Sequence, residues 1–142
     1  MSSGADRTDW RELREFRHVD LESSFVLGWQ FGGDALCVDL DLCLEPGHAF
    51  YEPPRPAEKA CIRPAVLEFP HCENLSRPDD RAGADIGAIV AALDIGNIDG
   101  LVVYDDGVYE LFGKFGTVVI DAGRAVLRLT GTWPSRRSDG EP

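Results

Sequence analysis

Two carboxylates alternate with apolar side chains between residues 36 and 44. Asp39 and Asp41 lie two positions apart, so an extended backbone places both on one face of a strand. A carboxylate pair at this spacing can bind a divalent ion or a sugar, or can act as acid and base in hydrolysis. The same pattern fits a strand whose aspartates face water and whose opposite face is buried, the buried side chains being Leu36, Val38, Leu40, Leu42 and Leu44. We expect this second arrangement, in which the acidic face can contact a basic partner.

A second group of polar side chains precedes the first long apolar segment. His18, Asp20 and Glu22 share one face if the chain is extended there, with about 6–7 Å between successive side chains. That spacing would suit a divalent ion, but it equally fits charged residues that face water at the start of a strand. We therefore expect no metal at these residues, and we group them with Asp39 and Asp41 as candidate partner-binding residues.

The remaining candidate for chemistry is a cysteine next to a histidine, His71-Cys72. A thiol becomes a nucleophile when a base lies within hydrogen-bond reach, but neighbouring residues on a strand point to opposite faces. No cysteine pair has the short spacing of a zinc site. We expect free thiols that pack as small apolar side chains, although the sequence leaves their reactivity open; the thiols are Cys37, Cys43, Cys61 and Cys72.

Short catalytic and cofactor motifs are absent from the sequence. It has no G-x-S-x-G, H-E-x-x-H or G-x-G-x-x-G, and its nearest match to a phosphate-binding Walker loop, residues 107–114, is one residue too long. The sequence therefore predicts no catalytic residue, no metal and no cofactor. This favours a binding protein over an enzyme and leaves enzymatic activity open.

The charge of the chain restricts its partners. The 142 residues include 25 acidic and 14 basic side chains, which give a net charge of -11 at pH 7. A surface this negative repels nucleic-acid phosphates and anionic lipids, so we expect neither nucleic acid nor membrane as a partner. A basic protein is the expected partner, although charge of this sign also maintains solubility. Because no apolar stretch is long enough to span a membrane and the N-terminus is polar, we expect a cytoplasmic protein.

Local patterns predict the elements that would position these residues. Asp9 followed by Glu12 forms a capping pattern that predicts a short helix over residues 9–16. A period of two then predicts a strand with its large side chains on one face, namely Phe25, Leu27, Trp29 and Phe31. Glycines at the next turn predict a hairpin into the strand at residues 36–44.

The second half of the chain alternates breakers with short apolar segments. Four prolines between residues 45 and 56 predict an extended connection, followed by strand character at 60–62 and 65–69. Apolar residues spaced three and four apart after Asp85 predict a short helix that Gly96 would end. The remainder predicts a meander with strands at residues 98–104, 108–115, 117–121 and 124–130.

Together these elements predict one mainly β domain, with an α+β domain as the alternative. We expect an antiparallel meander of about seven strands folded as a sandwich or half-barrel, with one or two short helices. The domain is expected to span residues 9–132, between an N-terminal tail at 1–8 and a C-terminal tail at 133–142.

The order of these strands resembles that of small bacterial β-rich proteins, some of which are grouped with immunity proteins of polymorphic toxin systems. The resemblance is carried by the segment 20–27, the hairpin that ends at Leu44, the strand at 66–69 and the meander at 109–120. His18 stands two positions before Asp20, whereas these proteins often have histidine and aspartate adjacent. The resemblance implies a protein that binds and blocks a partner, and it transfers no catalytic residue.

Two functions follow as expectations. The first is a non-enzymatic, immunity-like protein-binding domain with an acidic contact surface that includes Asp39 and Asp41. The alternative is a small-molecule-binding protein or enzyme whose pocket lies between the sheet and the Pro-rich segment, with His18, His48 or His71 as the titrating group. A homo-oligomer joined through sheet edges is a third alternative.

Overall fold

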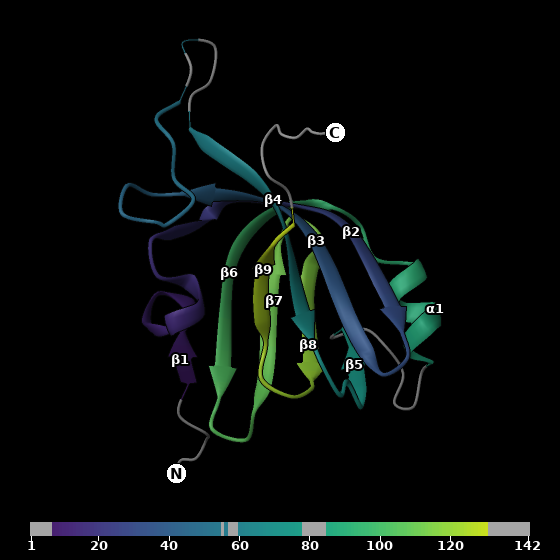
Figure 1. Ribbon diagram of the computed structural model, residues 1–142. Helices are drawn as coiled ribbons and strands as arrows, with labels where there is room; N and C mark the ends of the chain where they lie inside the picture. Colours follow the sequence, from purple (N-terminus) through teal and green to yellow (C-terminus); the bar gives the residue numbers. More distant parts are fainter. Residues whose placement is uncertain (1–6, 55, 57–59, 78–84, 131–142) are drawn as a thin grey trace.

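The computed structural model describes residues 7–54, 56, 60–77 and 85–130 (Figure 1). Within these residues the strands are β1 (Arg7–Asp9), β2 (Val19–Gly32), β3 (Ala35–Leu44), β4 (Cys61–Phe69), β5 (Asn74–Ser76), β6 (Gly96–Tyr104), β7 (Val108–Gly113), β8 (Gly116–Asp121) and β9 (Val126–Leu129). Two short 3-10 turns, η1 (Trp10–Glu12) and η2 (Arg14–Phe16), follow β1, and one α-helix, α1 (Ile86–Ala91), precedes β6.

All the strand pairs are antiparallel and form one sheet in the order β5-β8-β7-β6-β2-β3-β4-β9. Strand β6 has two neighbours on one side, because its first residues pair with β2 and its last residues pair with β1. Among the described strands no pair joins β5 to β9, so the sheet is not closed into a barrel.

The two halves of the sheet pack face to face around one apolar core (Figure 1). Phe69 on β4 and Tyr109 on β7 make an edge-to-face contact with ring centroids 5.1 Å apart, although three strands separate β4 from β7 in the sheet. The Tyr109 hydroxyl also accepts a hydrogen bond from the backbone N–H of Ala125 at 3.0 Å, which ties the segment before β9 to β7. The prediction of a mainly β, antiparallel meander folded over its apolar face is confirmed.

The described residues contain nine strands where about seven were expected. The additional strands, β1 and β5, have three residues each, which is too short for a periodic pattern to show in the sequence. Strand β1 includes Arg7 and Thr8 of the predicted N-terminal tail. Residues 1–6 and the predicted C-terminal tail at 133–142 lie outside the described residues.

The β2–β3 hairpin forms as predicted, but the large side chains of β2 do not share one face. Phe25 and Leu27 point outward, with 39% and 46% of their surface exposed, whereas Trp29 and Phe31 pack against the core. A register shift before Gly28 causes the change, because one extra residue in a strand moves every later side chain to the opposite face. The prediction of a single large-residue face on β2 is therefore wrong, whereas the alternation on β3 is confirmed.

A second irregularity lies at the start of β2. Asp20 pairs with Cys43 and Phe25 pairs with Asp41, so β2 contains three more residues than β3 across this stretch. The buried Ser24 bridges the irregularity, since its hydroxyl donates a hydrogen bond to the carbonyl of Asp20 and accepts one from the N–H of Cys43, both at 2.9 Å. The hydroxyl thus replaces a backbone acceptor that the irregular strand does not supply.

Residues 9–16 form two 3-10 turns in place of the predicted short helix. Leu13 separates the turns because its backbone is extended, with φ -88° and ψ 135°. Asp9 caps the first turn as predicted, its carboxylate accepting a hydrogen bond from the N–H of Arg11 at 3.2 Å. This broken geometry allows both Trp10 and Phe16 to be buried, with their rings 6.3 Å apart.

The helix predicted after Asp85 is α1, which packs against β2 and β5 (Figure 1). The Asp85 carboxylate caps it by accepting a hydrogen bond from the N–H of Ala88 at 3.0 Å, and Ile89 is buried. The prediction that Gly96 ends this helix is wrong, since α1 ends at Ala91 and Gly96 pairs with β2 as the first residue of β6. No helix in the described part of the chain is long and apolar enough to cross a membrane.

The Pro-rich segment is tied to the sheet at β4. This strand runs continuously through Pro64, where two separate pieces were expected. Pro64 lies just past the last β4–β9 pair, where its carbonyl still accepts a hydrogen bond from the N–H of Thr130 at 3.1 Å and only the reciprocal bond is missing. Arg63 is 6% exposed and donates a hydrogen bond to the Glu52 carboxylate at 3.1 Å. Glu52 belongs to the Pro-rich segment, so the buried arginine fixes that segment against the end of the sheet.

Candidate functional site

Asp39 and Asp41 lie on the side of β3 that faces away from the core. Asp41 is paired across the strands with Phe25, and Asp39 accepts a hydrogen bond from Gln30 Nε2 at 3.0 Å. Neither aspartate forms an ion pair with a cationic side chain in the described part of the chain. Neither carboxylate therefore has a counterion among the residues that the structure describes.

Large apolar side chains share this side of the hairpin with the aspartates. Phe25 and Leu27 are among the exposed large hydrophobic residues of the protein, and both lie before the Gly28 bulge. A further carboxylate on this side, Glu68 of β4, is ion-paired with Arg128 of β9. We use the term outer face for the four residues that combine apolar exposure with unpaired charge, which are Phe25, Leu27, Asp39 and Asp41.

His18, Asp20 and Glu22 have different polar contacts. Asp20 accepts a hydrogen bond from the Ser23 hydroxyl at 2.7 Å, whereas Glu22 forms an ion pair of 2.5 Å with Arg11. His18 precedes the strand with a left-handed φ of 59°. Asp20 and Glu22 alternate with the buried Val19 and Leu21, so both face outward as expected for an extended chain, whereas the left-handed backbone of His18 takes this residue out of the row. Among the described residues no group of three or more metal-ligating side chains is present.

The side chains of His71 and Cys72 have different surroundings. The exposed His71 ring places Nδ1 3.0 Å from the Asp34 carboxylate, whereas Cys72 is 5% exposed and its thiol contacts a backbone carbonyl. All four cysteines are free. Burial raises the pKa of the Cys72 thiol, and likewise the pKa values of Cys37 and Cys43. These three thiols are therefore held in the neutral form, which is the poor nucleophile.

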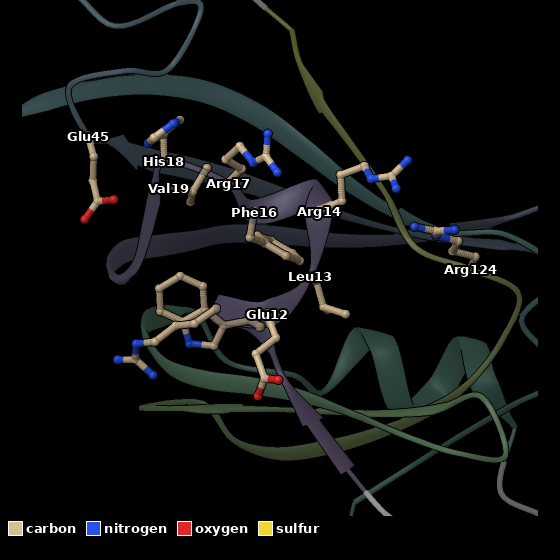
Figure 2. Close-up of a pocket in the computed structure, with 11 residues that line it drawn as sticks. Glu12, Leu13, Arg14, Phe16, Arg17, His18, Val19, Glu45 and Arg124 are labelled. Carbon is tan, nitrogen blue, oxygen red and sulfur yellow. The ribbon is translucent and has the colours of Figure 1, made fainter.

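A cavity of about 670 Å³ lies beside the two 3-10 turns (Figure 2). Its walls come from η1 and η2, the start of β2, the first residue of the Pro-rich segment and the loop before β9. The lining residues are Trp10, Arg11, Glu12, Leu13, Arg14, Phe16, Arg17, His18, Val19, Glu45 and Arg124. The alternative function requires a pocket between the sheet and the Pro-rich segment. This cavity lies at the start of that segment and includes His18, but His48 and His71 do not line it.

Four arginines line the cavity, and none of them is among the predicted site residues. Arg11, Arg14 and Arg17 follow one another at intervals of three residues. The extended Leu13 separates Arg11 from the second turn, whereas Arg14 and Arg17 bracket η2, where three residues per turn place both side chains on one side of the backbone. An α-helix has 3.6 residues per turn and fans the same side chains over an arc, so predicting an ordinary helix here conceals the pattern.

The charged groups of the cavity are divided between two sides. Figure 2 shows the guanidinium groups of Arg14 and Arg17 on one side of the turns and the Glu12 carboxylate on the opposite side. Arg124 Nε donates a hydrogen bond to the Glu15 carboxylate at 2.6 Å. Burial raises the pKa of Glu15, but the hydrogen bond from Arg124 and the charges of Arg124 and Arg14 outweigh it and lower that pKa overall. Glu15 therefore stays ionised at neutral pH and keeps Arg124 in place.

His18 is held against the Pro-rich segment. Its carbonyl accepts a hydrogen bond from the N–H of Glu45 at 2.9 Å, and its ring would lie 3.0 Å from a Cβ added to Gly47. Burial lowers the pKa of the neighbouring His48, and the charge of His18 lowers it further. The glycine thus allows the imidazole to sit close to the backbone at the edge of the cavity.

The molecule therefore offers two candidate sites of opposite character. The outer face combines unpaired carboxylates with exposed apolar groups, whereas the cavity is lined by four arginines against two glutamates. Comparison of the chain with family models, with curated proteins and with solved structures finds no match.

Proposed function

We propose that this protein is a non-enzymatic, immunity-like binding domain that recognises a basic protein through its outer face. The observation that carries the proposal is the presence of two carboxylates without counterions next to two exposed, large apolar side chains on one hairpin. Protein interfaces combine buried aromatic or aliphatic anchors with charge complementarity at their edges. The outer face provides both kinds of contact within four residues.

The charge of the whole chain supports the same partner chemistry. With a net charge of -11, the protein accelerates the encounter with a positively charged molecule and disfavours anionic ones. Once in contact, Asp39 and Asp41 would accept hydrogen bonds from lysine or arginine side chains of the partner. Phe25 and Leu27 would bury apolar surface that water now covers.

The surroundings of the titratable groups support binding over catalysis. The Cys72 thiol is buried, its pKa is raised, and His71 contacts Asp34 rather than the thiol. Free cysteines are typical of a reducing compartment, which supports a cytoplasmic location. The cavity is the feature that favours the alternative function, binding of a small molecule. None of the residues that line it belongs to the outer face.

The proposal is tested by a capture experiment that compares three immobilised proteins. These are the wild type, the double variant Asp39→Asn/Asp41→Asn, and the control Asp105→Asn/Asp121→Asn, which removes two exposed carboxylates elsewhere. Proteins captured from a lysate of the expressing cells are eluted by raising the salt concentration from about 20 mM to about 500 mM, which shortens the range of charge attraction. Mass spectrometry then identifies proteins whose capture depends on Asp39 and Asp41.

We expect a basic protein that the wild type and the control capture and that the Asp39→Asn/Asp41→Asn variant loses. Binding of that protein in purified form should then weaken when Leu27 is replaced by serine. Capture that is equal in all three proteins, or that includes no basic protein, would contradict the proposed function. Size-exclusion chromatography of the wild type alone separates this outcome from self-association through sheet edges.

A further inference from the structure

We propose that the cavity beside the 3-10 turns binds a compact ligand bearing an oxyanion, a phosphate or a carboxylate, through the guanidinium groups of Arg14 and Arg17. The inference does not depend on the proposed function, because it uses none of the residues of the outer face. It assigns the chain a second binding site with the opposite charge preference.

The charge of the cavity is inverted relative to that of the protein. Acidic residues outnumber basic ones 25 to 14 in the whole chain, yet among the described residues four arginines and two glutamates line the cavity. Cations that lie close together in a recess repel one another, which costs electrostatic energy. A bound anion offsets this cost because it attracts each of the cations. The arrangement therefore favours a negatively charged occupant.

Two of the four arginines are already neutralised by carboxylates. Arg11 is ion-paired with Asp9 and with Glu22, and Arg124 is hydrogen-bonded to Glu15. Arg14 and Arg17 form no ion pair within the described residues. Their guanidinium groups therefore offer the planar donors that match phosphate and carboxylate oxygens.

The local backbone brings these two arginines together. Arg14 is the first residue of η2 and Arg17 is its C-terminal cap, whose N–H donates a hydrogen bond to the carbonyl of Arg14 at 3.2 Å. Residues three apart are eclipsed in 3-10 geometry, so both side chains leave the turn on the same side. Figure 2 shows both guanidinium groups on that side. Both side chains are exposed, so they are free to turn toward one oxyanion on that side.

The floor and the edge of the site are fixed. Phe16, between the two arginines, and Val19, two residues after Arg17, are each 2% exposed, so the backbone on both sides of Arg17 is anchored in the core. His18 follows Arg17 directly and is held by the hydrogen bond between its carbonyl and Glu45. A fixed backbone reduces the entropy that the arginines lose when they bind a ligand.

A buried donor in the cavity wall is also unsatisfied. Trp10 is 4% exposed, it lines the cavity, and its Nε1–H has no hydrogen-bond acceptor among the described residues. Buried donors are nearly always paired in folded proteins. The indole nitrogen itself is shielded from solvent, so this unmet donor lies within the wall of the cavity.

The size of the cavity and its glutamates restrict the ligand. A volume of about 670 Å³ is typical of sites for small molecules. Glu12 and Glu45 also line the cavity, and they disfavour an extended polyanion such as a nucleic acid. A compact molecule with one or two oxyanion groups fits both conditions.

The test is titration of the isotope-labelled protein with inorganic phosphate, with citrate and with chloride at matched ionic strength, followed by NMR. The backbone and Arg Nε signals of residues 14 and 17 report binding at the site. The variant Arg14→Gln/Arg17→Gln removes both donors, and the control Arg7→Gln/Lys114→Gln removes two exposed cations outside the cavity. Unfolding midpoints of both variants establish that they are folded.

We expect saturable shifts at residues 14 and 17 with phosphate or citrate but not with chloride. The dissociation constant should rise at least about tenfold in Arg14→Gln/Arg17→Gln, which corresponds to about 1.4 kcal/mol, and should stay unchanged in the control. Saturation by phosphate alone or by citrate alone identifies the oxyanion. No saturable binding of either anion, or equal binding by both variants, would overturn the inference.

Discussion

Replacing Ser24 with alanine removes the hydroxyl that bridges the irregular start of β2. Ser24 is 1% exposed, and its hydroxyl makes two hydrogen bonds of 2.9 Å, with the carbonyl of Asp20 and the N–H of Cys43. Without the hydroxyl the buried N–H of Cys43 has no acceptor, which costs about 1–3 kcal/mol, and the lost bond to the half-buried Asp20 adds about 0.5–1.5 kcal/mol. We expect the free energy of unfolding to fall by about 2–4 kcal/mol.

Urea unfolding followed by tryptophan fluorescence measures this loss, because Trp10 and Trp29 pack in or against the core. The midpoint should fall with an unchanged m value, and the melting temperature should fall by about 5–12 °C. The matched control is Ser23→Ala, whose hydroxyl contacts only the exposed side of Asp20 and whose loss should cost within about 0.5 kcal/mol. A loss below about 1 kcal/mol for Ser24→Ala, or equal losses for the two variants, would refute the assigned role.

Two further predictions concern close packing and thiol ionisation. Gly113→Ala should destabilise the protein by about 1–3 kcal/mol, since an added Cβ would lie 2.2 Å from the carbonyl oxygen of Asn97, whereas Gly32→Ala, with nothing within 4 Å, should leave the urea midpoint nearly unchanged. Burial raises the pKa of three thiols, so the folded protein holds these protons more tightly than the unfolded chain. Their stabilising contribution is complete below about pH 8.5 and is lost as the pH rises through the folded-state pKa values. The thiols concerned are Cys37, Cys43 and Cys72. The urea midpoint, measured between about pH 7 and pH 10, should therefore fall as the pH rises. If Cys37→Ala did not reduce the slope of the midpoint against pH, the result would contradict this prediction.

The strands whose pattern is complete within a few residues are predictable from the sequence. The alternation of Leu36 to Leu44 identifies β3 and its buried face, because a period of two has no other regular explanation. The glycine turn identifies the hairpin, and the spacing of the apolar residues after Asp85 identifies α1. Each of these features depends on neighbours in the chain, so tertiary contacts did not alter it.

The faces of β2 could not be predicted in the same way. The bulge before Gly28 is defined only by the register against β3, and the sequence of β2 contains no signal strong enough to locate it. The left-handed backbone of His18, which separates it from Asp20 and Glu22, likewise has no signal in the sequence. The positions of Asp39 and Asp41 were predictable because β3 itself is regular.

Predicting the cavity would have required both the local sequence and the tertiary structure. The interval of three between Arg14 and Arg17 is present in the sequence, but it places both side chains on one side only because η2 has a 3-10 backbone. The remaining walls come from Glu45 and Arg124, which lie far along the chain. Local alternation and capping are therefore sufficient to determine the strands and their mainly β class, whereas register shifts and contacts between distant segments decide which charged side chains meet, because these depend on the packing of the whole sheet.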